Sequence, residues 1–397
     1  MLSMSSESPE FLRLATRCVH AGARPGPGSP GLVPTIDRST TFVQFPETQA
    51  LTDAGRWEEA LVYSRYANPT LALVEERIAD LEGASGSLLF GSGQAAMASA
   101  LYACLEPGAP VAGAHELYGG TLDLLESLEG QGHEYLRFAV SSAQDLDRVL
   151  AAGARLVVCE SISNPATVVA DLPRMAQQVH AVGGLLLVDA TFASPALQRP
   201  LEHGVDLVMH SATKALAGHS DVTAGVVSTA DRKLLSKVWN WRKRLGGILD
   251  PGAAYLLDRG MRTLVLRVRA QCEGASALAA ALAARPEVRA VYHPSCTSHP
   301  DYELAARLLD GPGSVLSFEL AAGDGAMREF VGRLNLACDA PSLGGVETLV
   351  SLPRFMSHAF LDDAGRRAAG IGDGMVRVAV GIEDPRDLVA DFLGALS

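Results

Sequence analysis

Short apolar runs alternate with segments of helical periodicity between about residues 69 and 230. The runs lie at residues 87–90, 110–112, 155–159, 184–188, 207–209 and 225–227, and residues 173–181 are typical of the helical segments between them. Such alternation predicts a mostly parallel sheet that is covered by helices on both faces. In sheets of this kind ligands bind at the carboxyl ends of the strands. Polar residues that directly follow the apolar runs are therefore the first candidates for a site.

The pattern changes on both sides of this segment. The first 60 or so residues are rich in Pro, Gly, Ser and Thr and have little amphipathic periodicity, which favours an extended arm that another surface must order. Residues 255–284 predict one long helix or two, and strands are expected near 289–292, 314–319 and 376–380. We therefore expect an N-terminal arm over residues 1–67, a large domain over 68–256 and a smaller α+β domain over 257–397.

Composition narrows the possible functions. The 397 residues are 48% hydrophobic and 20% charged, as in ordinary soluble globular proteins. The formal net charge of −12 argues against nucleic-acid binding, which usually needs a basic face. No apolar run approaches the roughly 18 residues of a membrane span, and the first residues lack the regions of a signal peptide. We expect a cytoplasmic protein with neither a nucleic-acid nor a membrane partner.

The cysteines give no sign of a metal site. The six cysteines are widely scattered and include no Cys-x-x-Cys pair. Neither a bound metal nor a disulfide framework is therefore expected.

Two charged residues lie just after buried apolar runs. Lys214 closes a loop of small and hydroxylated residues after Met209, and Asp189 ends the run 184–188; Glu160 falls at a third strand end. A buried amine can act as a nucleophile, and a buried aspartate can keep a pyridine nitrogen protonated. Pyridoxal 5′-phosphate (PLP) needs this pair of groups. The chain is therefore predicted to be an enzyme.

Further residues fit the same cofactor, although each also has a structural explanation. Gly93 and Gln94 begin a predicted helix after a strand, where free backbone N–H groups can bind phosphate. The hydroxyls of Ser211 and Thr213 can donate to the phosphate, or they can satisfy local backbone. The ring of Tyr118 can lie on a planar cofactor while its phenol acts as an acid.

Together these motifs resemble the PLP-dependent enzymes of Cys/Met metabolism, the transsulfuration group with fold type I architecture. The matching segments occur in family order from about residue 18 to the C-terminus, at 63–70, 92–96, 118–121, 160–165, 188–195, 211–221, 342–349 and 376–384. The resemblance implies that Lys214 is the Schiff-base lysine and proton shuttle, that Asp189 pairs with the pyridine nitrogen, and that Tyr118 is the stacking and acid/base tyrosine.

The resemblance also implies the remaining contacts. Tyr63 and Arg65 would reach the phosphate from a neighbouring subunit, so that active dimers are required and a homotetramer is expected. Asn164 would lie beside the ring hydroxyl of the cofactor. Arg377 would bind the substrate α-carboxylate as a planar bidentate donor, with Ser342 assisting.

The substrate is indicated less directly. Cystathionine γ-lyases of this family carry acidic residues where Val62 and Pro341 stand, and an arginine where Asp123 stands. The absence of these acidic residues and of the arginine favours a small thioether substrate such as methionine, cleaved by γ-elimination to a thiol, 2-oxobutanoate and ammonia. Against this, methionine γ-lyases typically carry cysteine where Gly120 stands. Cystathionine γ-lyase and γ-synthase activities remain alternatives, as does a β-lyase, in which Asp123 would meet a distal ammonium group.

Two other classes of protein share the fold. One is a protein that has lost catalysis and serves in binding or assembly, but the set of Lys214, Asp189, Tyr118 and Arg377 argues against it. The other is an aminotransferase, from which the motif set points away.

Overall fold

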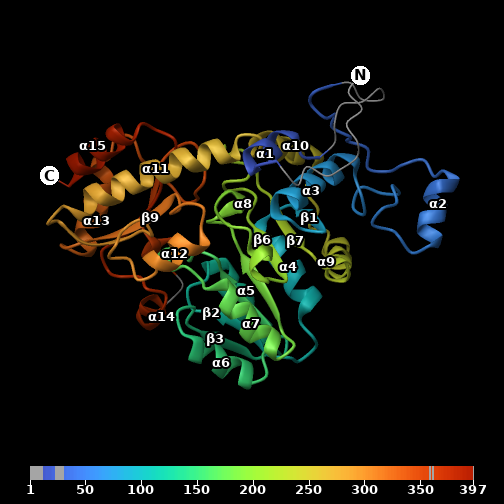
Figure 1. Ribbon diagram of the computed structural model, residues 1–397, viewed down its shortest axis with the longest axis horizontal. Helices are drawn as coiled ribbons and strands as arrows, with labels where there is room; N and C mark the ends of the chain where they lie inside the picture. The colour runs from blue at the N-terminus through green and yellow to red at the C-terminus, as the bar shows by residue number, and fades with distance from the viewer. Residues whose placement is uncertain (1–11, 23–30, 357–358, 360–361, 397) are drawn as a thin grey trace.

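A seven-stranded sheet lies at the centre of the larger part of the chain in the computed structural model, which describes residues 12–22, 31–356, 359 and 362–396 (Figure 1). Its strands are β1 (Gly86–Phe90), β2 (Val111–Ala114), β3 (Tyr135–Phe138), β4 (Leu156–Glu160), β5 (Leu185–Asp189), β6 (Leu207–His210) and β7 (Gly225–Thr229). Their order is β1-β7-β6-β5-β4-β2-β3, and only the pairings made by β7 are antiparallel. The predicted mostly parallel sheet is confirmed.

Helices cover both faces of this sheet. They are α3 (Pro69–Glu82), α4 (Gly93–Cys104), α5 (Gly119–Glu129), α6 (Ala143–Ala151), α7 (Leu172–Ala181), α8 (Ser194–Leu197), the 3-10 turn η1 (Pro200–His203) and α9 (Arg232–Leu245). In β7, Val226 packs into the core cluster that contains the apolar residues of α3, whereas Val227 packs into the cluster that contains those of α4. Successive strand residues point to opposite faces, so α3 and α4 lie on opposite sides of the sheet.

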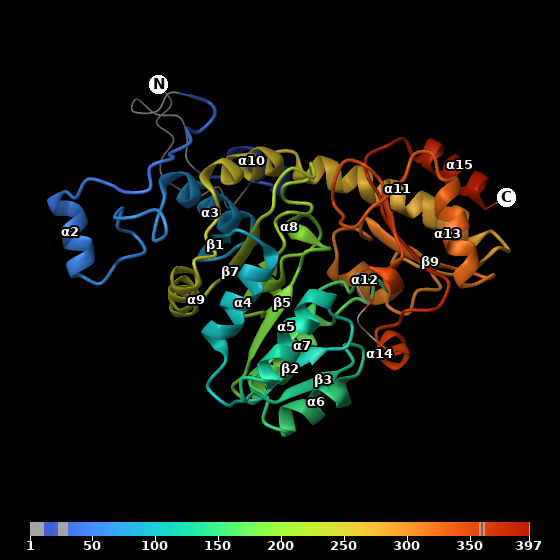
Figure 2. The same cartoon turned by 180° about the vertical axis from the view of Figure 1, so that it is seen from behind.

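A second, five-stranded sheet forms a smaller α+β unit beside the first (Figure 2). Its strands are β8 (Val288–Tyr292), β9 (Val315–Leu320), β10 (Cys338–Asp339), β11 (Leu349–Ser351) and β12 (Met375–Ala379), in the order β10-β11-β12-β9-β8. The helical elements of this unit are α12 (Tyr302–Leu308), α13 (Asp324–Arg333), η2 (Pro353–Phe355), α14 (Asp363–Ala368) and α15 (Pro385–Ala395).

Two helices connect the units. The segment expected to form one helix or two forms α10 (Pro251–Met261) and α11 (Leu264–Ala283), and α11 packs against both β8 and α15 of the smaller unit. The predicted domain boundary at residues 256 and 257 falls inside α10, and the exact boundaries stay a prediction.

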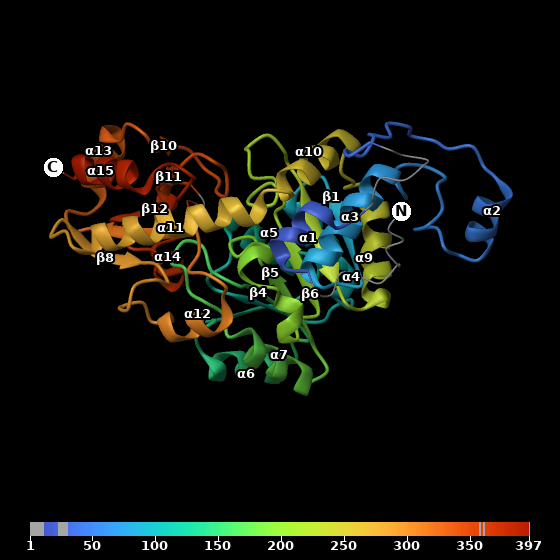
Figure 3. The same cartoon turned by 45° about the horizontal axis from the view of Figure 1, so that its top comes forward.

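The N-terminal segment is less extended than predicted. It contains α1 (Leu14–His20), which packs on α3 and α11 and buries Cys18, and α2 (Pro46–Asp53), which projects away from the body of the molecule (Figure 3). Most of its Pro- and Gly-rich stretch, residues 23–30, lies outside the described residues. No helix among the described residues combines the length and the apolar character needed to cross a bilayer.

Candidate active site

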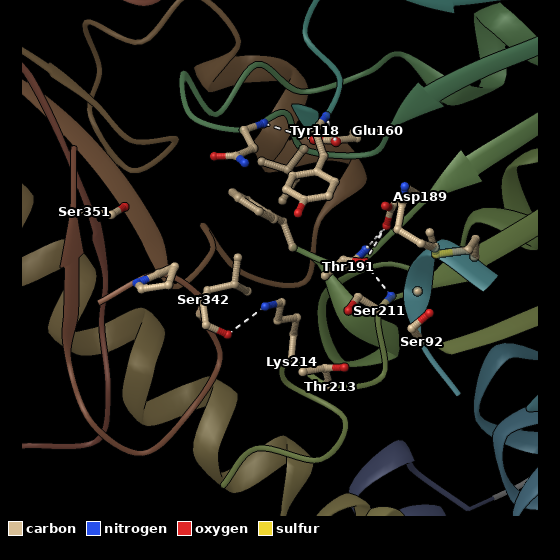
Figure 4. Close-up of a pocket in the computed structure, with 18 of the residues that line it drawn as sticks. Ser92, Tyr118, Glu160, Asp189, Thr191, Ser211, Thr213, Lys214, Ser342 and Ser351 are labelled. Carbon is tan, nitrogen blue, oxygen red and sulfur yellow. Dashed lines mark hydrogen bonds between the residues drawn. The ribbon is translucent and has the colours of Figure 1, made fainter. Parts of the chain in front are cut away.

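A cavity of about 600 Å³ opens at the carboxyl ends of β4, β5 and β6, and residues of the smaller unit close its other side (Figure 4). It brings together most of the residues that the sequence singled out, although some lie more than 200 positions apart. The predicted residues that line it are Gly93, Gln94, Tyr118, Asn164, Asp189, Ser211, Thr213, Lys214, Pro341, Ser342 and Arg377.

Asp189 is held at the end of β5 by the loop that follows it. One oxygen, Oδ1, accepts hydrogen bonds from the backbone N–H of Thr191 at 2.9 Å and from its hydroxyl at 2.5 Å. The hydroxyl of Thr191 in turn accepts the backbone N–H of Ser211 at 2.8 Å. Burial raises the pKa of Asp189, while the Thr191 hydrogen bonds oppose the rise. A cationic partner facing Oδ2, such as a protonated pyridine nitrogen, would favour the ionised carboxylate.

Lys214 points into the cavity from the loop after β6. Its amine lies 2.7 Å from the hydroxyl oxygen of Ser342, to which it donates a hydrogen bond. Burial and the nearby charge of Arg377 lower the pKa of Lys214 from 10.5 to about 8, and the charge of Asp189 acts in the opposite direction. An appreciable fraction of the amine is therefore neutral and nucleophilic near neutral pH.

The N-terminus of α4 faces the loop that carries Lys214. Ser92 caps this helix by accepting the N–H of Ala95 at 3.1 Å. A Cβ atom on Gly93 would meet Cβ of Ser211 at 3.0 Å, so glycine lets the helix start lie against the lysine loop. Free N–H groups and the helix dipole make this end suitable for a phosphate.

The two hydroxyl residues of the lysine loop differ. Thr213 uses its hydroxyl on the backbone of Ala224, donating to the carbonyl at 3.1 Å and accepting the N–H at 2.9 Å. Ser211 places its hydroxyl beside Gly93, at the start of α4. Of the two, Ser211 has the hydroxyl that is better placed for a phosphate.

Glu160 organises the opposite wall of the cavity. Its two carboxylate oxygens accept the backbone N–H of Tyr118 at 2.5 Å and of Asn164 at 3.0 Å. Burial raises the pKa of Glu160 well above its ordinary value, and the charge of Asp189 adds to the rise. Tyr118 directs its ring over the cavity (Figure 4). Gly120 is needed behind this ring, because a Cβ there would lie 2.7 Å from Cε1 of Tyr118.

Arg377 reaches the cavity from β12. Its guanidinium donates to Oδ1 of Asn164 at 3.1 Å and to the carbonyl of Ser342 at 2.9 Å. Its Nε is buried and makes no hydrogen bond within the described residues. Burial lowers the pKa of Arg377 to about 10. A buried guanidinium that pairs with no carboxylate in the described part of the chain is a suitable receptor for a carboxylate ligand.

Four predicted site residues lie outside the cavity. Arg65 donates to the carbonyl of Lys243 at 2.8 Å, and its guanidinium carbon lies 4.8 Å from the centre of the Tyr66 ring. Tyr63 is 45% exposed in the same segment. Val62 precedes it and is half-buried, while Asp123 is exposed on α5. Their roles stay predictions.

The sequence prediction left several lining residues without a role. Thr191, Phe192, Ile162 and Leu343 lie within the matching segments at 188–195, 160–165 and 342–349, and Met209 ends the apolar run before the lysine loop, so these five carried a signal. The others have no pattern that points to the cavity, because the fold alone brings them there. They are Thr223, Ser351 and Met356.

The cavity fits PLP on the chemistry of its donors. It offers an amine that can be neutral near neutral pH, a buried carboxylate 25 positions upstream, a helix N-terminus for the phosphate and an aromatic ring for stacking. Within the described ranges, no group of three or more His, Cys, Asp or Glu side chains is arranged to bind a metal ion.

The fold and the site define a PLP-dependent enzyme of fold type I. The family model for Cys/Met metabolism PLP-dependent enzymes matches residues 15–397. L-Methionine γ-lyase of Pseudomonas putida is 38% identical over 396 residues, which cover 99% of this chain and 98% of that protein. Cystathionine γ-synthase of Escherichia coli (strain K12) is 39% identical over 381 residues, which cover 95% and 96%. The chain therefore belongs to the family of Cys/Met-metabolism PLP-dependent enzymes, and it uses PLP.

Solved structures agree with this membership. The crystal structure of cystathionine γ-synthase from Xanthomonas oryzae pv. oryzae in complex with cystathionine has a TM-score of 0.92 and 37% identity, covering 97% of this chain and 98% of that chain. A cystathionine γ-lyase from Micromonospora echinospora has a TM-score of 0.90 and 35% identity, covering 97% and 99%. These neighbours differ in the activities they are named for, so likeness alone does not select a reaction.

Proposed function

We propose that the protein is a carbon–sulfur lyase that cleaves L-methionine or a similar thioether amino acid by γ-elimination. The products would be a thiol, 2-oxobutanoate and ammonia, with water consumed. The observation that supports this proposal is that each charged side chain lining the cavity already has another role, so that none is left for a second polar end of the substrate.

Four charged side chains line the cavity among the described residues. Lys214 and Asp189 are assigned to the cofactor, and Arg377 to the substrate α-carboxylate. Glu160 accepts a backbone N–H on each of its two oxygens. None of the four is left to bind the distal ammonium and carboxylate groups of cystathionine.

Apolar side chains contribute to the part of the wall that comes from the smaller unit, alongside Ser342, Ser351 and Arg377. Pro341, Leu343 and Met356 lie there, and Phe192 contributes from the loop after β5. An apolar wall favours a short thioether, and it leaves the polar end of a larger substrate without hydrogen bonds.

The chain's own residues would then act as follows. PLP, when bound, stabilises negative charge on the substrate carbons next to its ring. Arg377 orients the substrate through its carboxylate, which directs the α-proton towards Lys214. The amine of Lys214 takes this proton and carries protons between neighbouring carbons. Tyr118 supplies a proton to the departing sulfur. General acid–base steps of this kind each contribute roughly 10²–10⁴-fold.

Cystathionine chemistry is the second candidate, and one observation favours it. The cysteine expected of methionine γ-lyases would place its Cβ at Gly120 only 2.7 Å from Cε1 of Tyr118 and 3.1 Å from Nε2 of Gln94, so the Tyr118 ring would have to shift to admit it. The second candidate comprises γ-cleavage or γ-synthesis of cystathionine. A β-lyase that uses Asp123 is a third, with less support because that residue lies outside the cavity.

A product assay tests these candidates. Purified holoenzyme is supplied separately with methionine, with cystathionine, and with an O-acylhomoserine plus cysteine. Release of methanethiol and 2-oxobutanoate from methionine supports the proposal. Cystathionine cleavage or synthesis without methanethiol release would refute it in favour of the second candidate. The K214A variant, which should be inactive with all three substrates, is the control for contaminating enzymes.

The same proposal includes a neighbouring subunit. The N-terminal segment exposes large apolar side chains, including Leu32 at 84%, Val43 at 74% and Phe45 at 59%. Exposed apolar side chains concentrated in one projecting segment favour contact with another chain. We expect this segment to pack on a second copy, where Tyr63 and Arg65 reach the phosphate, and we expect a homotetramer of such dimers.

A further inference from the structure

His210, the last residue of β6, is a buried ionisable residue that has no part in the proposed chemistry. It is 1% exposed, and its Nε2 lies 2.6 Å from Oε1 of Glu82, which ends α3 and is fully buried. His210 pairs across the strands with Val226, which packs in the core cluster of α3. Paired residues share a face, so the imidazole lies behind the sheet rather than in the cavity.

The neighbours of His210 connect it to Asp189. Met209, directly before it, is the register partner of Asp189 on β5. Ser211, directly after it, donates its N–H to the Thr191 hydroxyl, which donates to Asp189. The imidazole therefore lies immediately behind the strand ends that present Asp189 to the cofactor.

The charges of these groups alternate. Burial lowers the pKa of His210, but the charge and hydrogen bond of Glu82 and the charge of Asp189 outweigh it, so the pKa of His210 is raised. The charge of His210 in turn lowers the pKa of Asp189, against the effect of burial. Arg199 is a further charged group near Glu82. Each buried charge thus has a neighbour of opposite sign, as buried charges require.

A purely structural explanation of this pair is weak. Oε2 of Glu82 is buried and makes no hydrogen bond within the described residues, and a buried charged oxygen without a partner is costly. Apolar side chains would fill the same space without this cost, so the charges have a use beyond packing.

We propose that His210 and Glu82 are positioning residues that keep Asp189 ionised from behind the sheet, so that Asp189 can hold a proton on the ring nitrogen of bound PLP. This inference rests on the pairing of Asp189 with the ring nitrogen, which belongs to the proposed function. Glu82 keeps the imidazole charged, the imidazolium stabilises the carboxylate, and the carboxylate stabilises the protonated ring.

Nitrogen-15 NMR of holoenzyme loaded with ring-labelled PLP tests the proposal without substrate. The variants are E82Q and H210Q, which remove one charge each, and D189N as the reference for complete loss. H293Q is the matched control, since His293 is also fully buried but bonds to Ser295 and Gly313 in the smaller unit. We expect roughly tenfold weaker proton binding at the ring nitrogen in E82Q and H210Q, about one pKa unit, and no change in H293Q.

The outcomes distinguish the role of His210 and Glu82 from the pairing of Asp189 with the ring nitrogen. If E82Q and H210Q match the unmodified protein while D189N loses the ring proton, this proposal is wrong and the Asp189 pairing stands. If the ring nitrogen of the unmodified protein carries no proton, both fail. Should the variants not fold, nitrogen-15 histidine labelling of the unmodified holoenzyme decides: a doubly protonated His210 ring above pH 7 supports the proposal, and a neutral ring overturns it.

Discussion

The amine of Lys214 donates a hydrogen bond of 2.7 Å to the hydroxyl of Ser342, which joins the two units across the cavity. Ser342 has a backbone φ of 102°, an uncommon value for a residue with a side chain. Arg377 donates to the carbonyl of the same serine. The serine is therefore held between the proposed nucleophile and the proposed carboxylate receptor, although 128 positions separate it from Lys214.

The first prediction concerns the pH dependence of cofactor attachment. Because burial and Arg377 lower the pKa of Lys214 to about 8, the neutral amine fraction grows as pH rises through that value. The rate at which protein freed of PLP recombines with PLP should therefore rise with pH and level off above it. Stopped-flow absorbance in the visible band measures this rate.

The R377Q variant is the control for this cause. Removing the cation should move the pKa of Lys214 towards its ordinary value of 10.5 and shift the rate profile to higher pH. A profile that is flat around pH 8, or that is unmoved in R377Q, would contradict the assigned cause.

The same shift affects stability. Because the pKa of Lys214 is lower in the folded protein than in the unfolded chain, the unfolded chain binds more protons at pH values between these two pKa values. The contribution of Lys214 to the free energy of unfolding should therefore rise with pH there.

The second prediction concerns Thr191. In T191V, Asp189 loses the hydroxyl donor and the N–H of Ser211 loses its acceptor. We expect the free energy of unfolding to fall by about 1–3 kcal/mol and kcat to fall with it, because one of the bonds that lowers the pKa of Asp189 is gone. Denaturant unfolding and steady-state kinetics measure both. T191S keeps the hydroxyl and should behave nearly as the unmodified protein, so equal behaviour of the two variants would exclude this role.

The third prediction concerns Gly344, which packs beneath the lysine loop. It has a φ of 75°, and a Cβ there would lie 2.5 Å from the backbone nitrogen of Ala215. Gly108 has nearly the same φ, 74°, with nothing within 4 Å of its Cβ position. G108A should cost about 1 kcal/mol from the backbone alone. G344A should cost about 3 kcal/mol or more and weaken PLP binding. If G344A and G108A had equal free energies of unfolding, the close approach of Gly344 to Ala215 would be relieved without cost.

The sequence could predict those features that depend on residues close together along the chain. Lys214 and Asp189 follow buried runs, so the strand pattern alone placed them at one sheet edge. Arg377 and Ser342 came only from the resemblance, since no local pattern joins residues of separate units. The apolar pattern does not predict β3, because the exposed Arg137 interrupts the run between Tyr135 and Phe138. α1 was omitted because its seven residues carry too little periodicity.

The last prediction tests the neighbouring subunit. If Arg65 acts in the site of another copy, each site combines Lys214 of one subunit with Arg65 of its neighbour. R65A then disables the neighbour's site, whereas K214A disables the site of its own subunit. A mixed dimer of the two variants then holds one site with both changes and one site with neither. Random reassociation of equal amounts should restore about a quarter of the unmodified activity, since half of the dimers are mixed and one of their two sites is intact.

The mixture must be made by unfolding and refolding the two variants together, with each variant refolded alone as the control. If Arg65 serves only its own subunit, through the carbonyl of Lys243 and the ring of Tyr66, the mixed dimers contain one K214A site and one R65A site. The activity then stays at the average of the separate variants. Recovery above that average therefore requires a shared site, because no rearrangement within one chain can supply Lys214 to a subunit that lacks it.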